Sequence, residues 1–119
     1  MIQSTVFIDR LELDTYIGLH KWEMADRQTV ISDIQMVIDM HDAAQNDDIA
    51  SSVNYEFISN HLRDWAYEHR CKLLEKMAYQ LIEELTTCCP TVQQMTIRLT
   101  KVGVVPHTTG CGVEVTYTR

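Results

Sequence analysis

The stretch Val6–Gly18, VFIDRLELDTYIG, alternates apolar with polar residues and then stops at a glycine. In an extended chain Leu11 and Leu13 point to one side, and the charged residues between and beside them point to the other. A period of two is typical of a strand that buries one of its faces. We therefore predict a strand over residues 6–16, ended by Gly18.

Three further segments have the period of a strand. Residues 30–40 alternate less regularly, with Val30, Ile34, Met36 and Ile38 on one face. Near the carboxyl end, residues 95–100 and 113–118 alternate β-branched or other apolar residues with threonine and charged residues. These segments predict a second, a third and a fourth strand.

Between the second and third strands, the hydrophobic period lengthens to that of a helix. Ile58, Leu62 and Trp65 recur at helical spacing behind Asn54, which is a suitable N-cap residue. A second apolar stripe runs through residues 72–87. The predicted order of elements is ββααββ.

This order predicts an α+β fold in one domain, residues 1–119, with two helices on one face of a four-stranded antiparallel sheet. The other face would carry polar residues such as Glu12, Arg98 and Thr116, and both edges of the sheet would be unpaired. A sheet that continues from subunit to subunit into a barrel pairs these edges. We therefore expect the subunits to join into a multimeric β-barrel.

The charge of the chain disfavours two classes of partner. Lys and Arg number 10 against 17 for Asp and Glu, and the formal net charge is -7. Such a chain repels both a nucleic-acid backbone and an anionic membrane. The sequence also lacks a long apolar run and the basic and apolar regions of a signal peptide, so we expect a cytoplasmic protein that binds neither nucleic acid nor membrane.

The cysteines and histidines do not form a recognisable metal motif. Cys71, Cys88, Cys89 and Cys111 show no Cys-x-x-Cys spacing, which favours reduced thiols. No two histidines are spaced as ligands on one face of a helix or strand. His107 and Cys111 lie four apart across a glycine-containing turn, and we interpret this as chance. The sequence therefore predicts no metal site.

Five short segments follow one another along the chain in this order: VFIDRLELDTYIG, IGLHKWE, DDIASSVNY, LLEKMA and LTKVG. Together they resemble the dihydroneopterin aldolase family, and the resemblance runs from Val6 to Tyr117. It implies the tunnelling fold, in which ββααββ subunits join into a barrel. It also implies a homo-oligomer, a tetramer or an octamer, with active sites shared between subunits.

The resemblance implies a carbon–carbon lyase of folate biosynthesis. Enzymes of this kind split 7,8-dihydroneopterin into 6-hydroxymethyl-7,8-dihydropterin and glycolaldehyde, in some cases with epimerase side activity. The pterin ring imine, next to the trihydroxypropyl side chain, accepts the electrons of the broken bond. Neither a Schiff base nor a metal is then required, and the resemblance implies that no cofactor is needed.

Five residues match functional positions of that family. By resemblance, Lys101 is the catalytic proton donor and organises the reacting water, and Glu23 lies near it and the substrate's hydroxyl groups. Tyr55 would stack on the pterin from a neighbouring subunit and relay a proton. Glu75, in the first turn of a helix, would anchor the pterin edge as a carboxylate, with a backbone group of Leu74 beside it. Trp22 would pack the loop that carries Glu23.

Each match has a plainer structural interpretation. A lone lysine at a strand end is usually solvated, and an acidic residue in a first helical turn is common as a partner of the helix dipole. Tyr55 could pack under a loop, and Glu23 could be a solvated loop residue.

Two other functions remain open from the sequence. His20 replaces the tyrosine common in this loop and LTKVGVVP replaces a Lys-Pro-Gly run, which leaves the side-chain specificity open. The first alternative is therefore a dihydroneopterin triphosphate epimerase, although its substrate calls for more basic residues than this acidic chain has. The second is a non-catalytic pterin-binding protein, for which Glu75 and a stacking aromatic residue would suffice.

Overall fold

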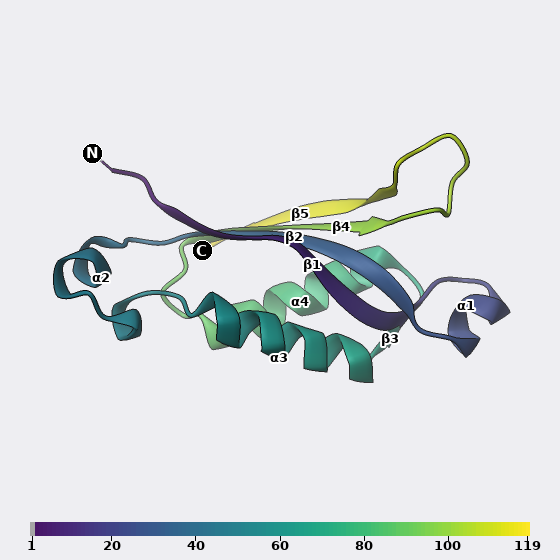
Figure 1. Cartoon of the computed structure of the whole chain (residues 1–119), viewed down its shortest axis with the longest axis horizontal. Helices are drawn as coiled ribbons and strands as arrows, with labels where there is room; N and C mark the ends of the chain where they lie inside the picture. Colours follow the sequence, from purple (N-terminus) through teal and green to yellow (C-terminus); the bar gives the residue numbers. More distant parts are fainter. Residues whose placement is uncertain (1) are drawn as a thin grey trace.

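The structure is a computed structural model that describes residues 2–119. The strands are β1 (Thr5–Ile17), β2 (Gln28–Val37), β3 (Arg70–Cys71), β4 (Gln94–Lys101) and β5 (Cys111–Thr118). The helices are α1 (Lys21–Ala25), α2 (His41–Asn46), α3 (Tyr55–Glu68) and α4 (Leu74–Cys88), with a 3₁₀ turn, η1, at Ile49–Ser51. The elements form two layers, a curled sheet and a pair of long helices (Figure 1). The predicted α+β class is confirmed.

The sheet has the strand order β3-β1-β2-β4-β5. The four long strands pair antiparallel, as expected, but the prediction of a four-stranded sheet is wrong by one strand. β3 pairs parallel with the end of β1, with Tyr16 opposite Arg70 and Ile17 opposite Cys71. The chain forms this ladder as it crosses the end of β1 between α3 and α4. Two residues are too few to produce a period that a sequence reader can detect.

A β-bulge in β1 keeps its apolar residues on one face. Ile8 pairs with Ile34 and Leu11 with Ser32, so that two residues of β1 stand opposite Asp33 alone. At the bulge Arg10 has a positive φ of 52°, and its N–H donates a 2.8 Å hydrogen bond to Asp33 Oδ1. Ile8 and Leu11 therefore share the helix-facing side of the sheet although they are three residues apart.

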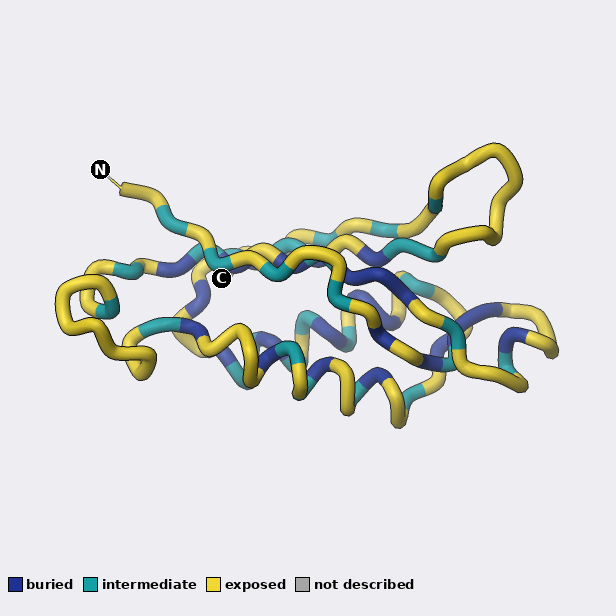
Figure 2. Tube along the Cα trace, viewed as in Figure 1, coloured by how far each residue is buried: buried dark blue, intermediate teal, exposed yellow. Residues whose placement is uncertain are grey.

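Helices α3 and α4 cover one face of the sheet with their apolar stripes (Figures 1 and 2). Asn54 caps α3 as predicted, because its side chain accepts a 3.1 Å hydrogen bond from the Phe57 N–H. Leu62 of α3 and Leu81 of α4 are fully buried against the sheet. Burying a leucine side chain contributes about 1.5–3 kcal/mol, so these stripes hold the two layers together.

The opposite face of the sheet is mostly polar and exposed, as predicted, although the buried Ile31 also lies on it. Arg98 Nη1 lies 3.8 Å from Glu114 Oε1, and the hydroxyl groups of Thr96 and Thr116 are 3.0 Å apart. Exposed ion pairs of this kind contribute little to stability. β5 forms one edge of the sheet, and on the other edge β1 has only the two-residue partner β3.

The segments between the long elements contain more structure than expected. The loop that carries Glu23 includes the helix α1, and the polar stretch after β2 includes α2 and η1. β2 ends at Val37, three residues before the predicted end, and the loop between β4 and β5 is exposed (Figure 2). Within residues 2–119, no helix combines the length and the apolar character that crossing a membrane requires.

Candidate functional site

A buried carboxylate meets an ammonium group where β4 ends beside α1, at the right-hand end of Figure 1. Glu23 Oε2 lies 2.6 Å from Lys101 Nζ, and the two side chains are 3% and 13% exposed. The alternative interpretation of Lys101 as a solvated surface lysine is therefore wrong. Glu23 is not a solvated loop residue either.

The strand register explains why Lys101 points inward. Leu13, Val30, Lys101 and Cys111 form one row across the sheet. Because opposed residues project to the same side, Lys101 extends the helix-facing series of β4 that includes Ile97 and Leu99. In the sequence, Lys101 follows Ile97 and Leu99 with the same period of two residues.

Because Gly18 has no side chain, the Glu23 carboxylate can occupy the space beside it. The glycine has a φ of +135°, which residues with a side chain rarely adopt, and a Cβ atom there would overlap the Glu23 carboxylate. The His20 N–H donates to Glu23 Oε1 at 3.3 Å, and the Gln28 side-chain amide donates to Oε2 at 3.4 Å. The strand thus ends at a glycine so that a carboxylate can fold back against it.

The hydrogen bond from Lys101 lowers the pKa of Glu23 below its ordinary value of 4.5. Burial acts in the opposite direction, and the hydrogen bonds from His20 and Gln28 add to the effect of the lysine. Glu23 is therefore ionised at neutral pH. The carboxylate accepts the hydrogen bond that Lys101 donates.

The ion pair lines a cavity of about 340 Å³ that reaches the start of α4. Leu74 and Glu75 line the same cavity and belong to the first turn of that helix. Leu73, at the N-cap, has an aliphatic side chain that cannot accept hydrogen bonds from the free N–H groups of this turn. The structure therefore brings four predicted site residues together, Glu23, Leu74, Glu75 and Lys101.

The fifth predicted site residue does not line this cavity. Tyr55 is the first residue of α3, is 60% exposed, and does not belong to the described residues that line the cavity. Trp22 is 63% exposed, so the prediction that it packs the loop in place is wrong for the single chain. Instead the rings of His20 and Trp22 stack, with their centroids 6.0 Å apart.

A larger hollow of about 660 Å³ lies between β1 and α3, lined by residues that include Asp9, Asn60 and Tyr67. All of its lining residues are exposed or partly exposed. A reaction site requires groups held at a perturbed charge state away from bulk water. The smaller cavity, with its buried ion pair, meets that requirement.

One cluster of potential ligands was missed by the sequence reasoning. His61 of α3 and Glu84 and Cys88 of α4 bring a ring nitrogen, a carboxylate oxygen and a sulfur atom within 4.8 Å of one another. The search for paired histidines and Cys-x-x-Cys could not find them. The available signal was the spacing of four between Glu84 and Cys88, which places both on one face of a helix.

The sequence and the fold both match known proteins. The sequence model of the dihydroneopterin aldolase family (FolB) matches residues 6–116. The chain belongs to this family. A dihydroneopterin aldolase of Escherichia coli is 33% identical over 110 residues, which cover 91% of this chain and 88% of the relative.

Two solved structures share the fold along nearly the whole chain. A Vibrio cholerae structure assigned as dihydroneopterin aldolase (FolB) superposes with a TM-score of 0.93 at 33% identity and covers all of both chains. The Escherichia coli dihydroneopterin aldolase in complex with neopterin superposes with a TM-score of 0.90 at 30% identity, covering 96% of this chain and 98% of that one. A dihydroneopterin triphosphate 2'-epimerase of Pseudomonas aeruginosa is 27% identical over 80 residues, 67% of this chain and 65% of the relative.

Replacing Gly18 tests whether the glycine holds the ion pair in place. In Gly18→Ala the new methyl group overlaps the Glu23 carboxylate, so we expect Glu23 to leave Lys101 and the free energy of unfolding to fall. The matched control is Gly103→Ala, because Gly103 also has a positive φ, of 77°, but open space around its Cβ position. The control should lose about 1–2 kcal/mol from backbone strain alone.

Urea denaturation at one protein concentration measures both losses. The loss for Gly18→Ala should exceed that of the control, since burying a charge whose partner has moved away costs several kcal/mol. Equal losses for the two variants would show that Gly18 serves only the backbone.

Proposed function

We propose that this protein is an aldehyde-lyase that cleaves 7,8-dihydroneopterin into 6-hydroxymethyl-7,8-dihydropterin and glycolaldehyde, a step of folate biosynthesis. The observation that carries the proposal is the buried pair of Glu23 and Lys101, which lines one cavity with the first turn of α4. Membership of the family and the neopterin bound by the Escherichia coli relative support the substrate class.

In this proposal the start of α4 binds the pterin ring. The edge of a pterin carries an amino group and a ring N–H side by side, and a carboxylate accepts both hydrogen bonds. Glu75 supplies the carboxylate from the first turn of the helix. A backbone group of Leu74 completes the contact with the same edge.

The Glu23 and Lys101 pair handles protons at the other end of the substrate. One proton leaves a side-chain hydroxyl, the carbon–carbon bond breaks, and a proton returns to the carbon that stays on the ring. Lys101 donates this proton or positions a water molecule that does so. Glu23 orients the lysine and accepts hydrogen bonds from the substrate's hydroxyl groups.

This chemistry needs neither a Schiff base nor a metal. The ring imine of the substrate accepts the electron pair of the broken bond and becomes an enamine. A lysine amine must lose its proton to attack a carbonyl group, and Lys101 instead donates a hydrogen bond to the Glu23 carboxylate. The pairing therefore favours an acid–base role over a covalent one.

A neighbouring subunit completes the site in this proposal. Tyr55 is exposed on the single chain, and so are Phe57 and Trp22, which is unusual for aromatic residues of one compact domain. Both edges of the sheet offer backbone groups to another chain. We infer a tetramer or an octamer in which Tyr55 of one subunit stacks on the pterin held by the next.

The two alternatives are less well supported. The epimerase relative aligns with a smaller part of this chain, and a triphosphate would be repelled by a protein of net charge -7. A simple binding protein gains nothing from a buried ion pair, which costs desolvation energy. Product analysis separates all three functions.

Purified protein incubated with 7,8-dihydroneopterin should release glycolaldehyde and 6-hydroxymethyl-7,8-dihydropterin in equal amounts. Turnover should persist after chelator treatment and after borohydride is added with substrate, because neither a metal nor a Schiff base takes part. In Lys101→Ala we expect kcat to fall by about 100-fold or more, the range for general acid–base groups. Lys76→Ala, on the exposed side of α4, is the control and should keep full turnover.

Three results would contradict this function. An isomer of the substrate as the only product would indicate an epimerase, and binding without any product would indicate a binding protein. Unchanged turnover in Lys101→Ala would remove the lysine from the mechanism.

Glu75→Gln tests the proposed anchor of the pterin. The glutamine has nearly the same size, but its NH₂ group would face a donor of the pterin edge. We expect pterin affinity to fall by about 30-fold to 1000-fold, which corresponds to roughly 2–4 kcal/mol. Titration calorimetry with neopterin measures this loss.

The matched control is Glu83→Gln on the exposed face of the same helix, which should bind neopterin normally. Both proteins should keep their helical circular dichroism. Equal affinities for wild type and Glu75→Gln would place the pterin elsewhere.

Mixed oligomers test whether two subunits share each site. Tyr55→Ala and Lys101→Ala should each be nearly inactive, because each removes one half of every site. When the two variants are unfolded, mixed in equal amounts and refolded together, about a quarter of the sites should carry both native residues. Activity should therefore reappear. Variants refolded separately and then combined are the control, and absence of recovery in the co-refolded sample would place Tyr55 in the same subunit as Lys101.

A further inference from the structure

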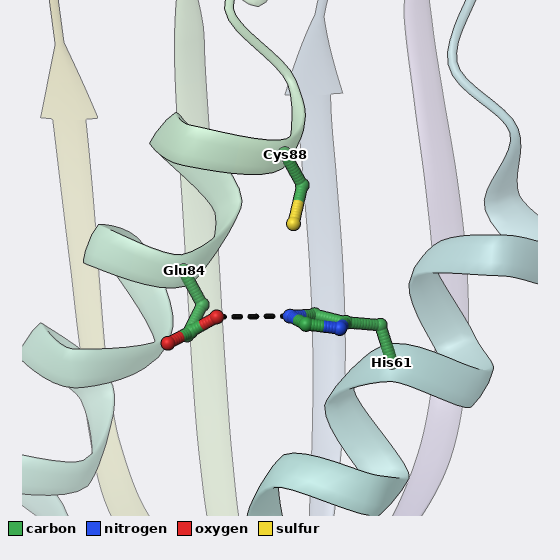
Figure 3. Close-up of side chains that lie close together, drawn as sticks. All are labelled: His61, Glu84 and Cys88. Atoms are coloured by element: carbon green, nitrogen blue, oxygen red, sulfur yellow. Dashed lines mark hydrogen bonds and ion pairs between the residues drawn. The ribbon is translucent and has the colours of Figure 1, made fainter.

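A cluster of three side chains lies between the two long helices, apart from the proposed active site. Figure 3 shows His61 reaching from α3 toward Glu84 and Cys88 of α4. His61 Nε2 lies 2.8 Å from Glu84 Oε2, and the three potential ligand atoms are all within 4.8 Å of one another. We propose that His61, Glu84 and Cys88 bind a divalent cation of the zinc class and thereby connect α3 to α4.

The three potential ligand atoms indicate which class of metal ion the cluster would bind. An imidazole nitrogen, a carboxylate oxygen and a thiolate sulfur are the three ligand types of zinc in proteins, at about 2.0–2.3 Å from the ion. Magnesium and calcium prefer oxygen atoms alone. A tetrahedral ion places its ligands roughly 3.4–3.8 Å apart, so small side-chain rotations would adjust the present spacing. A water molecule would take the fourth position.

Electrostatics also favour a cation at this cluster. A thiolate and a carboxylate so close together repel each other unless a positive charge lies between them. A doubly charged ion bound by one thiolate, one carboxylate and a neutral imidazole forms a site with no net charge.

The surroundings hold the ligands in place yet leave access from solvent. Arg119 donates hydrogen bonds to the carbonyl oxygens of Thr86 and Cys89, on either side of Cys88, and so fixes the end of α4. The rings of Phe57 and His61 stack with an interplanar angle of 10°. The side chains of His61 and Glu84 are 35% and 34% exposed, which gives an ion a path into the cluster.

The bound ion would have a structural role. Cys88 lies 13 residues after Glu75 along α4, about 20 Å at the rise of an α-helix. The ion is therefore remote from the proposed pterin anchor, and it connects the two helices that cover the sheet. Zinc should raise the stability of the fold without taking part in cleavage.

The test titrates the metal-free full chain with Zn²⁺ in a calorimeter and follows thermal unfolding with and without the ion. We expect one Zn²⁺ per chain and a melting temperature that rises with Zn²⁺ but not with Mg²⁺. Cys88→Ser and His61→Ala should each weaken zinc binding by at least about 10-fold, the lower end of the loss found even for residues that only hydrogen-bond to a metal ligand. Cys111→Ser, at an exposed cysteine, is the matched control and should bind zinc normally.

Co²⁺ provides a second measurement that does not depend on the stability of any variant. Wild-type protein loaded with Co²⁺ should show the charge-transfer absorption of a cobalt–thiolate bond, and Cys88→Ser should lack it. Absence of this absorption in the wild type would overturn the proposal. So would equal stabilisation by Mg²⁺, or zinc binding lost in Cys111→Ser but kept in Cys88→Ser. Because substrate is absent throughout, the result is independent of the proposed lyase activity.

Discussion

The ion pair between Glu23 and Lys101 connects parts of the chain that are 78 residues apart in sequence. A buried carboxylate is costly unless hydrogen bonds replace its water, and here the lysine, a backbone N–H and a side-chain amide supply them. Placing the carboxylate requires a glycine at the end of β1, the short helix α1, and a lysine on the inner face of β4. Much of the local structure at this end of the molecule follows from that one contact.

The two ends of α4 have different environments. Its first turn lines the cavity with the ion pair, where the Glu75 carboxylate suits a ligand with hydrogen-bond donors along one edge. Its last turn carries Glu84 and Cys88 opposite His61, where the donors suit a cation. The apolar stripe between these ends packs on the sheet and holds both at fixed positions. One helix can thereby serve substrate binding and stability separately.

A single chain presents only part of the proposed active site. The cavity is open, the sheet has two edges, and large apolar side chains such as Trp22 and Tyr55 are exposed. A small domain with a one-layer sheet cannot cover both faces with its own residues. In the proposed oligomer, assembly and catalysis would depend on the same surfaces, so the stability of the oligomer would be linked to the completeness of its sites.

The sequence by itself determined the elements whose signals are local. Periods of two and of 3.6 residues located the four long strands and both long helices, and Asn54 marked the start of α3, because side-chain direction follows directly from backbone geometry. The family motifs also located Glu23, Leu74, Glu75 and Lys101, which the structure brings to one cavity. The inward direction of Lys101 was not predicted from the residues alone, because a lone lysine at a strand end is usually solvated.

Only the tertiary structure decided the features that depend on contacts between distant segments. The two-residue strand β3 exists because the chain passes β1 there, and no period can reveal so short a ladder. The reason for Gly18 became clear only when the Glu23 carboxylate was found in the space of its missing side chain. The His61, Glu84 and Cys88 cluster needs two helices packed in one particular rotation, which sequence spacing within one helix cannot specify.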